Sequence, residues 1–366
     1  MDLSRFMDLS VVDAHVHFRD IDLMENMLNI AREARYHRVN VVSTISRERV
    51  NFNPEALYLK AKHPNLFYAF GGLDYSAVFM GSKQAEPSLP EQVDNLMEMG
   101  FDGIKMVEGK PTLRKMLQIP FDSGFYKEYF IHVESLGFPI LFHVNDPEEF
   151  WDAEKVPRWA KERGWFYDNT YPKKEQFYTE VENVLNRCPN LKVIFAHFYF
   201  LSADLERAAR LLDKYENVHL DLTPGVEMLY NFSAKLDAWR NFFLSYQDRL
   251  VYGTDISGGQ TLKQAVTRAW LVRNFLETDE KFFVPPSADS LLGQPEAPFK
   301  GMKLPRGVLE KIYAENFEGI VGGKPKELNL ETAIAECKRI GRTATQLGKI
   351  RPEENAALRI ASLLKQ

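Results

Sequence analysis

The chain has little cysteine, no long apolar run and no excess of basic residues. Only Cys188 and Cys337 occur among 366 residues, which fits a reducing compartment and excludes a disulfide framework and a thiolate zinc cluster. Any metal must therefore be held by histidine and carboxylate. No hydrophobic stretch reaches the length of a membrane span, and residues 1–10 carry mixed charges in place of a leader peptide, so we expect a cytoplasmic protein.

The charge balance argues against nucleic acid as a partner. The formal net charge is -5 at pH 7, and Lys and Arg are not gathered into a track that would follow phosphates. The glycine-rich phosphate turn of dinucleotide-binding sheets is also missing after the first apolar segment. With 45% hydrophobic and 27% charged residues, the composition is that of a folded protein with a large core, and we expect a small molecule as its partner.

What the sequence does contain is an alternation of short apolar segments with longer amphipathic ones. The short segments are rich in β-branched and aromatic residues, as strands are, and the longer ones have helical period. Eight strands that alternate with helices predict an α/β fold, a (β/α)8 TIM barrel, with a doubly wound open sheet as the alternative. The predicted strands are residues 10–17, 39–44, 66–73, 103–107, 139–144, 191–197, 218–223 and 250–255, and the helices include 24–36, 54–61, 90–99, 125–136, 174–187, 203–215 and 234–246.

Three further segments define the domain organisation. The barrel is expected to occupy residues 1–323, with an aromatic insertion at about 145–172 that either packs on itself or forms a lid over the site. Residues 282–303, rich in Pro and Gly, are expected to form a loop. Beyond it, 324–366 is a helical appendage with helices at 328–346 and 353–364, for packing or for a homodimer.

A histidine pair ends the first predicted strand, in Asp13-Ala14-His15-Val16-His17. Side chains two apart on a strand point to the same face, so both imidazoles could bind one ion, although two unrelated polar contacts would give the same pattern. Three later strands end in His143, His197 and Asp255. A single strand-end histidine is more typical of a hydrogen-bonded core residue, but the carboxyl ends of barrel strands share one mouth, and the group together favours a metal site.

This set resembles the amidohydrolase superfamily, in its amidohydrolase-related branch of metal-dependent hydrolases and nonoxidative decarboxylases. The resemblance runs from Val11 to Gly322 and rests on the Asp-x-His-x-His motif, Gly103-Ile104-Lys105, His143, His197, Gly253-Thr254-Asp255 and a last helix over 304–317 with Glu315-Asn316. The sequence departs from the branch at Phe198-Tyr199-Phe200, where the branch often has glycine.

The resemblance implies a metal site and two catalytic residues. It implies that His15, His17, His143 and Asp255 bind one divalent ion, most often zinc with manganese as the alternative, and that Asp255 and His197 take part in catalysis. In binuclear relatives, residues at the positions of His197 and a carbamylated Lys105 bind a second ion. The implied reaction is hydrolysis of an amide, lactone or ester bond in a small organic acid, with nonoxidative decarboxylation as the alternative. A barrel that binds a ligand without turnover is the alternative of another class.

Five residues are candidates for contact with the substrate: Arg19, Lys105, Asn145, Asp146 and Trp151. The segment around Arg19 resembles the first strand of dihydroorotases, where such an arginine grips a carboxylate, and a guanidinium matches a carboxylate in shape. The alternative is a surface ion pair of Arg19 with Asp20 or Asp22. Glu108 is a candidate ion-pair partner of Lys105, and Arg47 and Arg49 are further candidates for anion binding.

Overall fold

The protein is built round a ring of parallel strands. The computed structural model describes residue 3 and residues 8–225, 227–292 and 297–365. β8 pairs with β7 and β9 pairs with β1, so these two short strands together occupy the place of an eighth strand and close the ring. The predicted (β/α)8 barrel is confirmed. Its strands are β1 Val12–His17, β2 Arg38–Val42, β3 Phe67–Gly72, β4 Gly103–Gly109, β5 Ile140–Val144, β6 Val193–Phe195, β7 Val218–Asp221, β8 Leu250–Val251 and β9 Ile256–Ser257.

Two of the strands that end earlier than predicted are each followed by a predicted site residue with a left-handed backbone. The strand expected over 191–197 stops at Phe195, and His197 has a φ of 55°. The strand expected over 250–255 stops at Val251, and Asp255 has a φ of 59° before β9 begins. A residue with positive φ cannot continue the strand pleat, so each break presents its side chain at the end of the barrel.

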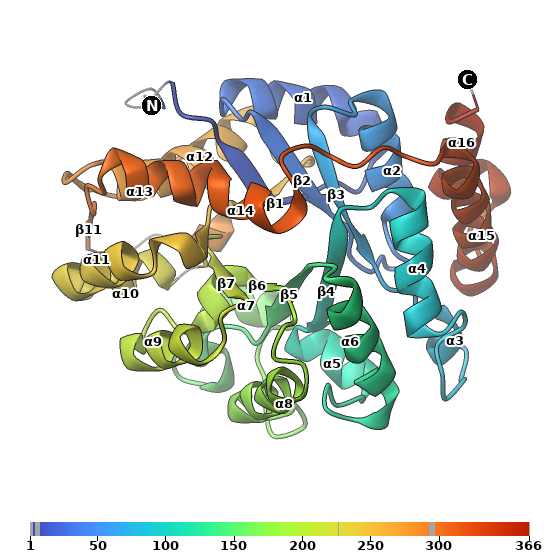
Figure 1. The fold of residues 1–366 in the computed structure, drawn as a ribbon, viewed down its shortest axis with the longest axis horizontal. Helices are drawn as coiled ribbons and strands as arrows, with labels where there is room; N and C mark the ends of the chain where they lie inside the picture. Colours follow the sequence, from blue (N-terminus) through green and yellow to red (C-terminus); the bar gives the residue numbers. More distant parts are fainter. Residues whose placement is uncertain (1–2, 4–7, 226, 293–296, 366) are drawn as a thin grey trace.

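Helices surround the ring of strands, and successive helices lie side by side on its outer face (Figure 1). The predicted helix over 174–187 has the observed bounds of α8, whereas α12 lies outside the predicted helices. The helices of the barrel are α1 Met24–Glu33, α2 Asn53–Lys62, α3 Ser76–Phe79, α4 Leu89–Met99, α5 Pro111–Leu117, α6 Gly124–Leu136, α7 Arg158–Glu162, α8 Lys174–Arg187, α9 Leu205–Lys214, α10 Met228–Ala234, α11 Leu236–Ser245, α12 Leu262–Glu277, α13 Arg306–Glu310 and α14 Asn316–Val321.

Local sequence signals set several helix ends. The Ser88 side chain accepts a hydrogen bond from the Glu91 backbone while Glu91 accepts one from the Ser88 backbone, which satisfies two free N–H groups at the start of α4. Thr261 and Gln264 form the same capping box at the start of α12. Gly100 ends α4 with a φ of 91°, which an L side chain rarely adopts.

The N-terminal end of the barrel is closed by apolar side chains. Phe317, on α14, packs against the rings of Tyr68 and Phe70 inside the ring of strands, with centroids 5.4 and 6.0 Å apart. A larger core fills the space between the strands and the surrounding helices. The barrel therefore opens only at the carboxyl ends of its strands, where catalytic groups of such barrels lie.

The C-terminal segment adds two helices outside the barrel, α15 Leu330–Gly348 and α16 Ala356–Leu363. They pack against each other and against α2, and α15 also contacts α4 (Figure 1). Ile340, Ala344 and Ala357 of this pair form a small apolar cluster with Val50, which belongs to the loop between β2 and α2. The extension thus rests on the side of the barrel that carries the first loops of the open end.

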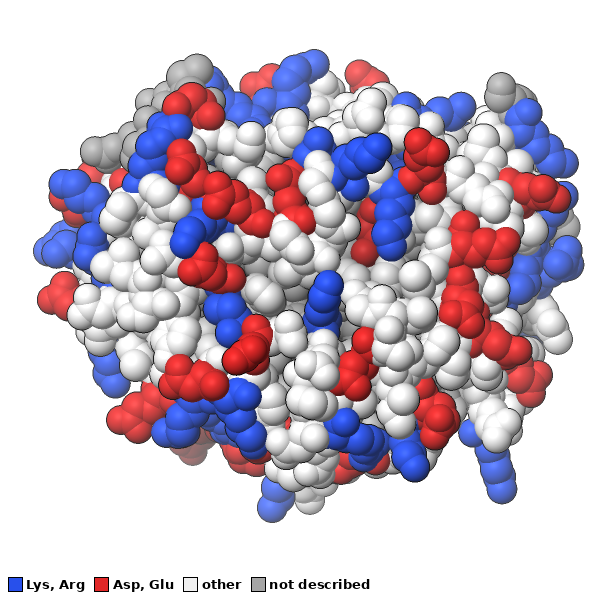
Figure 2. All heavy atoms as spheres, in the orientation of Figure 1, with Lys and Arg blue, Asp and Glu red and all other residues white. Residues whose placement is uncertain are grey.

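The segment expected as a loop over 282–303 is mostly irregular, with one short pairing of β10 Lys281–Phe282 and β11 Phe299–Lys300; its residues 293–296 lie outside the described part of the chain. Figure 2, seen from the side that carries α14, shows Lys and Arg interspersed with Asp and Glu over this face. Among the described residues, no helix combines the length and apolarity of a bilayer span.

Candidate active site

A cavity of about 960 Å³ lies at the carboxyl ends of the strands. It brings together eight of the ten residues singled out as metal, catalytic or substrate-binding: His15, His17, Arg19, Lys105, His143, Asp146, His197 and Asp255. The other two, Asn145 and Trp151, do not line it.

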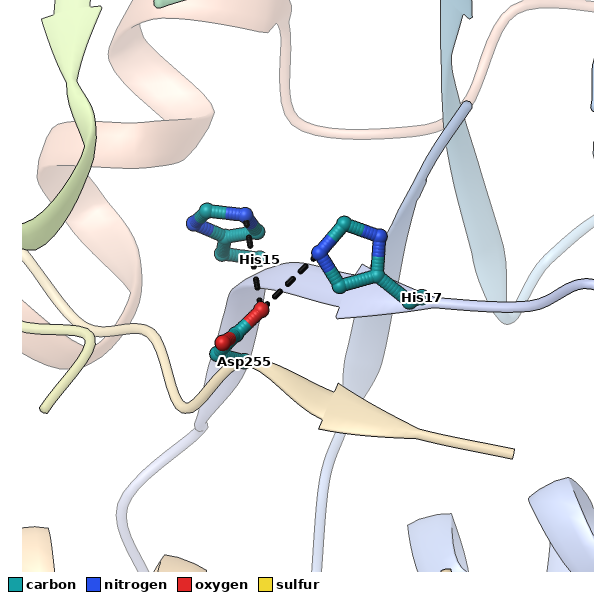
Figure 3. A group of neighbouring side chains, drawn as sticks. All are labelled: His15, His17 and Asp255. Carbon is teal, nitrogen blue, oxygen red and sulfur yellow. Dashed lines mark ion pairs between the residues drawn. The ribbon is translucent and has the colours of Figure 1, made fainter. Parts of the chain in front are cut away.

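Three of the predicted metal ligands point toward one another at the base of the cavity (Figure 3). Oδ1 of Asp255 lies 2.9 Å from Nε2 of His17 and 3.9 Å from Nε2 of His15. One potential ligand atom from each residue lies within 4.8 Å of the other two. The histidines come from β1 and the aspartate from the break before β9, so the group joins the two edges at which the barrel closes.

Hydrogen bonds hold the break that presents Asp255. Oδ1 and Oδ2 of Asp13 accept hydrogen bonds from the backbone N–H and the hydroxyl of Thr254, at 3.2 and 2.5 Å. Nη1 of Arg268 donates to the Thr254 carbonyl at 2.9 Å, and its guanidinium is paired with Asp289. The Asp13 carboxylate thus ties the start of β1 to the Asp255 turn, and Arg268 fixes it from α12.

Burial sets the protonation states of the group. It lowers the pKa of His17 to about 4 and that of His15 well below its ordinary value. Burial would raise the pKa of Asp255, but the hydrogen bond from His17 and the nearby imidazoles bring it well below the usual range. At neutral pH the site therefore offers neutral imidazoles and an ionised carboxylate, which are the forms that bind metal.

Asp221, at the end of β7, orients His15. Its Oδ2 lies 2.8 Å from Nδ1 of His15, and its Oδ1 accepts a hydrogen bond from the His197 backbone N–H at 2.7 Å. A carboxylate that fixes Nδ1–H of a ligand histidine leaves Nε2 free for an ion. Sequence reasoning missed this role, although Asp221 lies in the predicted strand 218–223 and a search of strand ends for carboxylates would have found it.

His143 and His197 lie on the far side of His15. The His197 ring is 5.5 Å from that of His15 and 4.9 Å from that of His143, between centroids. Nδ1 of His197 lies 3.3 Å from the Thr223 carbonyl, so the assigned tautomer carries the proton on Nδ1 and leaves Nε2 as an acceptor. Nε2 of His143 is buried, makes no hydrogen bond and lies 3.5 Å from Oδ1 of Asp146. The structure groups three predicted ligands closely and holds His143, the fourth, farther from them in the same cavity.

Lys105 lies inside the barrel against His15. Its Nζ is 3.0 Å from Nε2 of His15, and burial lowers its pKa to about 8. The expected ion pair with Glu108 is absent between these two described residues. Glu108 is buried near Tyr75, and burial raises its pKa to about 7. The two side chains lie on opposite faces of the strand because their positions are three apart, an odd offset.

Arg19 is exposed at the cavity wall and forms no ion pair with any residue in the described ranges. The alternative of neutralisation by its neighbours does not hold, because Asp20 caps the turn that follows and Asp22 pairs with Arg359 at 2.6 Å. The Arg19 guanidinium instead lies over the Phe52 ring, 5.9 Å from its centroid. It remains free to meet an anion in the cavity.

The aromatic insertion packs on itself and also forms part of the cavity wall. Phe150, Trp159 and Trp165 line the cavity and contact one another. Trp151 turns outward, where its Nε1 donates to the Pro172 carbonyl at 3.2 Å. Asn145 is buried in a left-handed turn after β5, and its side-chain amide donates to the Lys174 carbonyl. It therefore stabilises the backbone of the loop and does not face the cavity.

Asp146 does face the cavity. It is paired with Lys110 at 2.9 Å and accepts a hydrogen bond from Tyr167. Burial would raise the pKa of Asp146, but Lys110 and His143 bring it well below the usual range. The residue therefore links the cavity floor to the aromatic insertion.

The bulky segment after β6 is strained. Phe198, Tyr199 and Phe200 all have φ values between 52 and 56°, a conformation that costs a non-glycine residue roughly 1–2 kcal/mol. Their rings compensate through packing: Phe198 is enclosed by Phe232, Trp239 and Phe243, whereas Phe200 faces the cavity beside His197. Strain held in place by packing is a frequent property of functional sites.

The residues present fit a divalent ion. Two neutral imidazoles and a carboxylate converge, and one imidazole is oriented by Asp221. A third imidazole, on His143, lies in the same cavity, and its Nε2 makes no hydrogen bond and is 3.5 Å from Asp146. Nitrogen and carboxylate donors suit zinc or manganese. Lys105 opposes an ion at this place, because its ammonium group lies 3.0 Å from Nε2 of His15.

Comparison with known proteins gives a family and a fold. A family model described as Amidohydrolase matches residues 12–318. No curated protein matches the sequence.

Similar solved structures include an uncharacterised TIM-barrel protein from Bordetella bronchiseptica, 13% identical, which covers 89% of this chain and 99% of that one with a TM-score of 0.54. The 2,6-dihydroxybenzoate decarboxylase from Rhizobium is 13% identical and covers 86% and 98%, with a TM-score of 0.51. A manganese-bound dihydroxybenzoic acid decarboxylase from Polaromonas is 13% identical and covers 86% and 97%, also with a TM-score of 0.51. At such identities the likeness concerns the fold.

Proposed function

Because this chain belongs to the amidohydrolase family, we propose that it is a metal-dependent hydrolase that cleaves a C–N or C–O bond in a small organic acid. The observation that carries the proposal is the convergence of His15, His17 and Asp255 at the base of a large open cavity. Burial keeps the imidazoles neutral, and the hydrogen bond from His17 with the nearby imidazoles keeps the carboxylate ionised, as a metal site requires.

We assign one divalent ion to His15, His17 and Asp255, with His143 as the fourth ligand. Such an ion would lower the pKa of a water molecule toward about 7 and polarise a carbonyl oxygen. Zinc is the first candidate and manganese the second, which is the ion bound in the Polaromonas decarboxylase. Occupation by a second ion on His197 and Lys105 would require carbamylation of Lys105.

The residues of the chain supply the proton transfers. Asp255, ionised and in contact with His17, takes the proton of the attacking water and returns it to the leaving nitrogen or oxygen. His197 accepts a hydrogen bond at Nε2 and orients the water, because its Nδ1 proton is committed to the Thr223 carbonyl. Arg19 binds a carboxylate of the substrate.

Nonoxidative decarboxylation is the second candidate reaction. Two observations favour it: the similar structures include two decarboxylases of hydroxylated benzoic acids, and the cavity wall carries the rings of Phe150, Trp165 and Phe200. In that reaction Asp255, once protonated, would deliver its proton to the carbon that loses carbon dioxide. The same ligands serve both reactions, so the fold does not choose between them.

Metal content is the first experiment. Elemental analysis of the purified protein, reconstituted with zinc or manganese, should give about one ion per chain. The variants His15→Ala and Asp255→Ala should lose the ion, whereas His132→Ala, which removes a half-buried histidine of α6 outside the cavity, should keep it. Absence of metal in the reconstituted wild type would overturn the proposal.

The metal-loaded protein is then assayed on lactones, amides and aromatic carboxylic acids. Acid release from the first two supports hydrolysis, and release of carbon dioxide from the third identifies the second candidate. The Asp255→Asn variant should lose either activity by about 100-fold or more, because Asp255 carries the proton in both reactions. We retain the homodimer and the cytoplasmic location as expectations.

A further inference from the structure

Three arginines without ion pairs gather at the mouth of the cavity. Arg19 follows β1, and Arg47 and Arg49 belong to the loop between β2 and α2. All three line the cavity, all are exposed, and none is ion-paired within the part of the chain that the structure describes. The guanidinium of Arg49 lies over the Phe79 ring, 5.4 Å from its centroid, as that of Arg19 lies over Phe52.

The acidic groups of the cavity wall are already engaged elsewhere. Asp146 is paired with Lys110, Asp289 with Arg268, and Asp255 faces His17. The wall contains no glutamate among the described residues. The positive charge at the mouth is therefore not neutralised by the protein itself.

The acid that separates the two loop arginines in sequence, Glu48, faces away from the cavity. A Cβ on Gly348, at the end of α15, would lie 2.9 Å from Cγ of Glu48, so this side chain packs against the C-terminal extension. Glu48 is not among the lining residues, unlike Arg47 and Arg49 on either side of it. Glu48 therefore points to the side of the loop opposite to Arg47 and Arg49.

The loop that carries the pair is a small hairpin of fixed shape. Ile45 and Asn51 form an antiparallel bridge, and the Ser46 N–H donates to the Val50 carbonyl at 2.6 Å. Nδ2 of Asn51 donates to the Gly72 carbonyl at the end of β3, and Val50 is buried against α15 and α16. An anion would thus meet arginines whose backbone is already ordered, which lowers the entropic cost of binding.

We infer that Arg19, Arg47 and Arg49 bind an oxyanion that the substrate carries away from its reacting bond. The substrate is then an aromatic molecule with its reacting carbonyl or carboxylate group at the metal ligands and an oxyanionic group at the mouth, with its ring against Phe150, Trp165 and Phe200. Planar guanidinium groups match the oxygens of a carboxylate or a phosphate. This inference rests on the proposed function for the inner group and on the arginines for the outer one.

The test compares binding of benzoate, terephthalate and carboxyphenyl phosphate to the zinc-loaded protein by titration calorimetry. The probes with two oxyanions should bind at least about fivefold more tightly than benzoate, and this advantage should shrink as sodium chloride is raised. The double variant Arg47→Gln/Arg49→Gln should lose the advantage. Arg32→Gln/Arg210→Gln, which removes the same charge from exposed helix positions outside the cavity, should keep it.

The outcomes separate this inference from the proposed function. An advantage that is absent, or that survives in Arg47→Gln/Arg49→Gln, overturns the outer site even if zinc binds. If the wild-type protein binds no zinc, the proposed function is overturned. The same titrations on the metal-free protein then still measure whether the affinity for the oxyanion probes depends on Arg47 and Arg49. The tighter of terephthalate and carboxyphenyl phosphate identifies the outer group as carboxylate or phosphate.

Discussion

Single residues in the site act through the neighbours that hold them. His15 and Asp255 are common side chains in a protein, but Asp221 fixes the proton of one and Asp13 fixes the backbone of the other. Burial then lowers the pKa of the His15 imidazole, so that it is neutral at pH 7. The geometry of the site thus depends on two carboxylates outside the group of His15, His17 and Asp255.

We predict that Asp221→Asn weakens zinc binding by about 10- to 100-fold, the usual effect of removing the carboxylate behind a ligand histidine. The amide would no longer fix the Nδ1 proton of His15, which lies 2.8 Å from Oδ2 of Asp221. Competition with a chelator measures the affinity. Asp213→Asn, which alters an exposed aspartate bonded to Tyr246, is the control, and equal affinities in the two variants would contradict the prediction.

A second prediction concerns Glu55, a buried carboxyl of α2. Burial raises its pKa to about 8, whereas in an unfolded chain it is about 4.3. Between these values the folded state holds a proton that the unfolded state has lost, so the free energy of unfolding decreases as pH rises from about 4 to about 8, by at most about 1.4 kcal/mol per pH unit. Glu55→Gln should remove this decrease.

Urea unfolding at a series of pH values measures the effect of Glu55. The wild type should lose stability toward pH 8 relative to Glu55→Gln, and the two curves should converge near pH 4, below the unfolded pKa. The exposed Glu128→Gln variant is the control and should follow the wild type. Parallel curves for the wild type and Glu55→Gln would show that the carboxyl is ionised in the fold.

At the level of elements, the C-terminal helices contribute to the shape of the cavity mouth. α15 contacts the arginine hairpin through the cluster around Val50, and Arg339 of α15 pairs with Asp74, in the loop after β3, at 2.6 Å. Two loops of the open end are therefore braced from outside the barrel. The two C-terminal helices lie beyond the part matched by the family model, which ends at residue 318.

The contact between α15 and α16 allows a sharp test at Gly341. A Cβ at this position would lie 2.7 Å from Cγ of Leu358, so Gly341→Ala must push the helices apart. We expect the free energy of unfolding to fall by about 1–3 kcal/mol, after any gain in helix propensity is taken into account. Gly319→Ala, on α14, where an added Cβ meets no atom within 4 Å, should instead be neutral or stabilising by up to about 1 kcal/mol. Chemical denaturation measures the stability of both variants. Equal stabilities of Gly341→Ala and Gly319→Ala would contradict the tight packing of α15 on α16.

At the level of the whole molecule, the proposed ion would join strands from three parts of the barrel. His17 ends β1, His143 lies in β5, and Asp255 occupies the break between β8 and β9. A ligand that binds only the folded state stabilises it by mass action. The barrel and the metal site are therefore expected to be thermodynamically coupled.

We predict that zinc at about 100 times its dissociation constant adds about 2.7 kcal/mol to the free energy of unfolding and raises Tm by about 3–4 °C, and that a chelator reverses the effect. Asp255→Asn should show little of this rise, whereas His132→Ala should show all of it. Differential scanning calorimetry measures both. An equal rise in Asp255→Asn would indicate that zinc acts elsewhere on the chain.

The sequence by itself determined the barrel and the strands that carry its site. Apolar segments at regular spacing gave eight strand positions, and His15, His17, His143, His197 and Asp255 all line the cavity at their ends. The prediction worked because alternation and strand order are local properties, and parallel strands bring their ends to one mouth. The fourth place in the metal site, on His143, remains a prediction.

The tertiary structure decided which partners these residues have. Asp221 lies behind His15, Arg268 supports the Asp255 turn, and Glu108 turns away from Lys105, all through contacts between distant segments. It also decided that Arg19 has no ion pair, because Asp20 and Asp22 are used elsewhere, and that Arg47 and Arg49 share its cavity. Burial, hydrogen-bond partners and unpaired charge depend on the packing of the whole chain, and residue spacing carries no record of them.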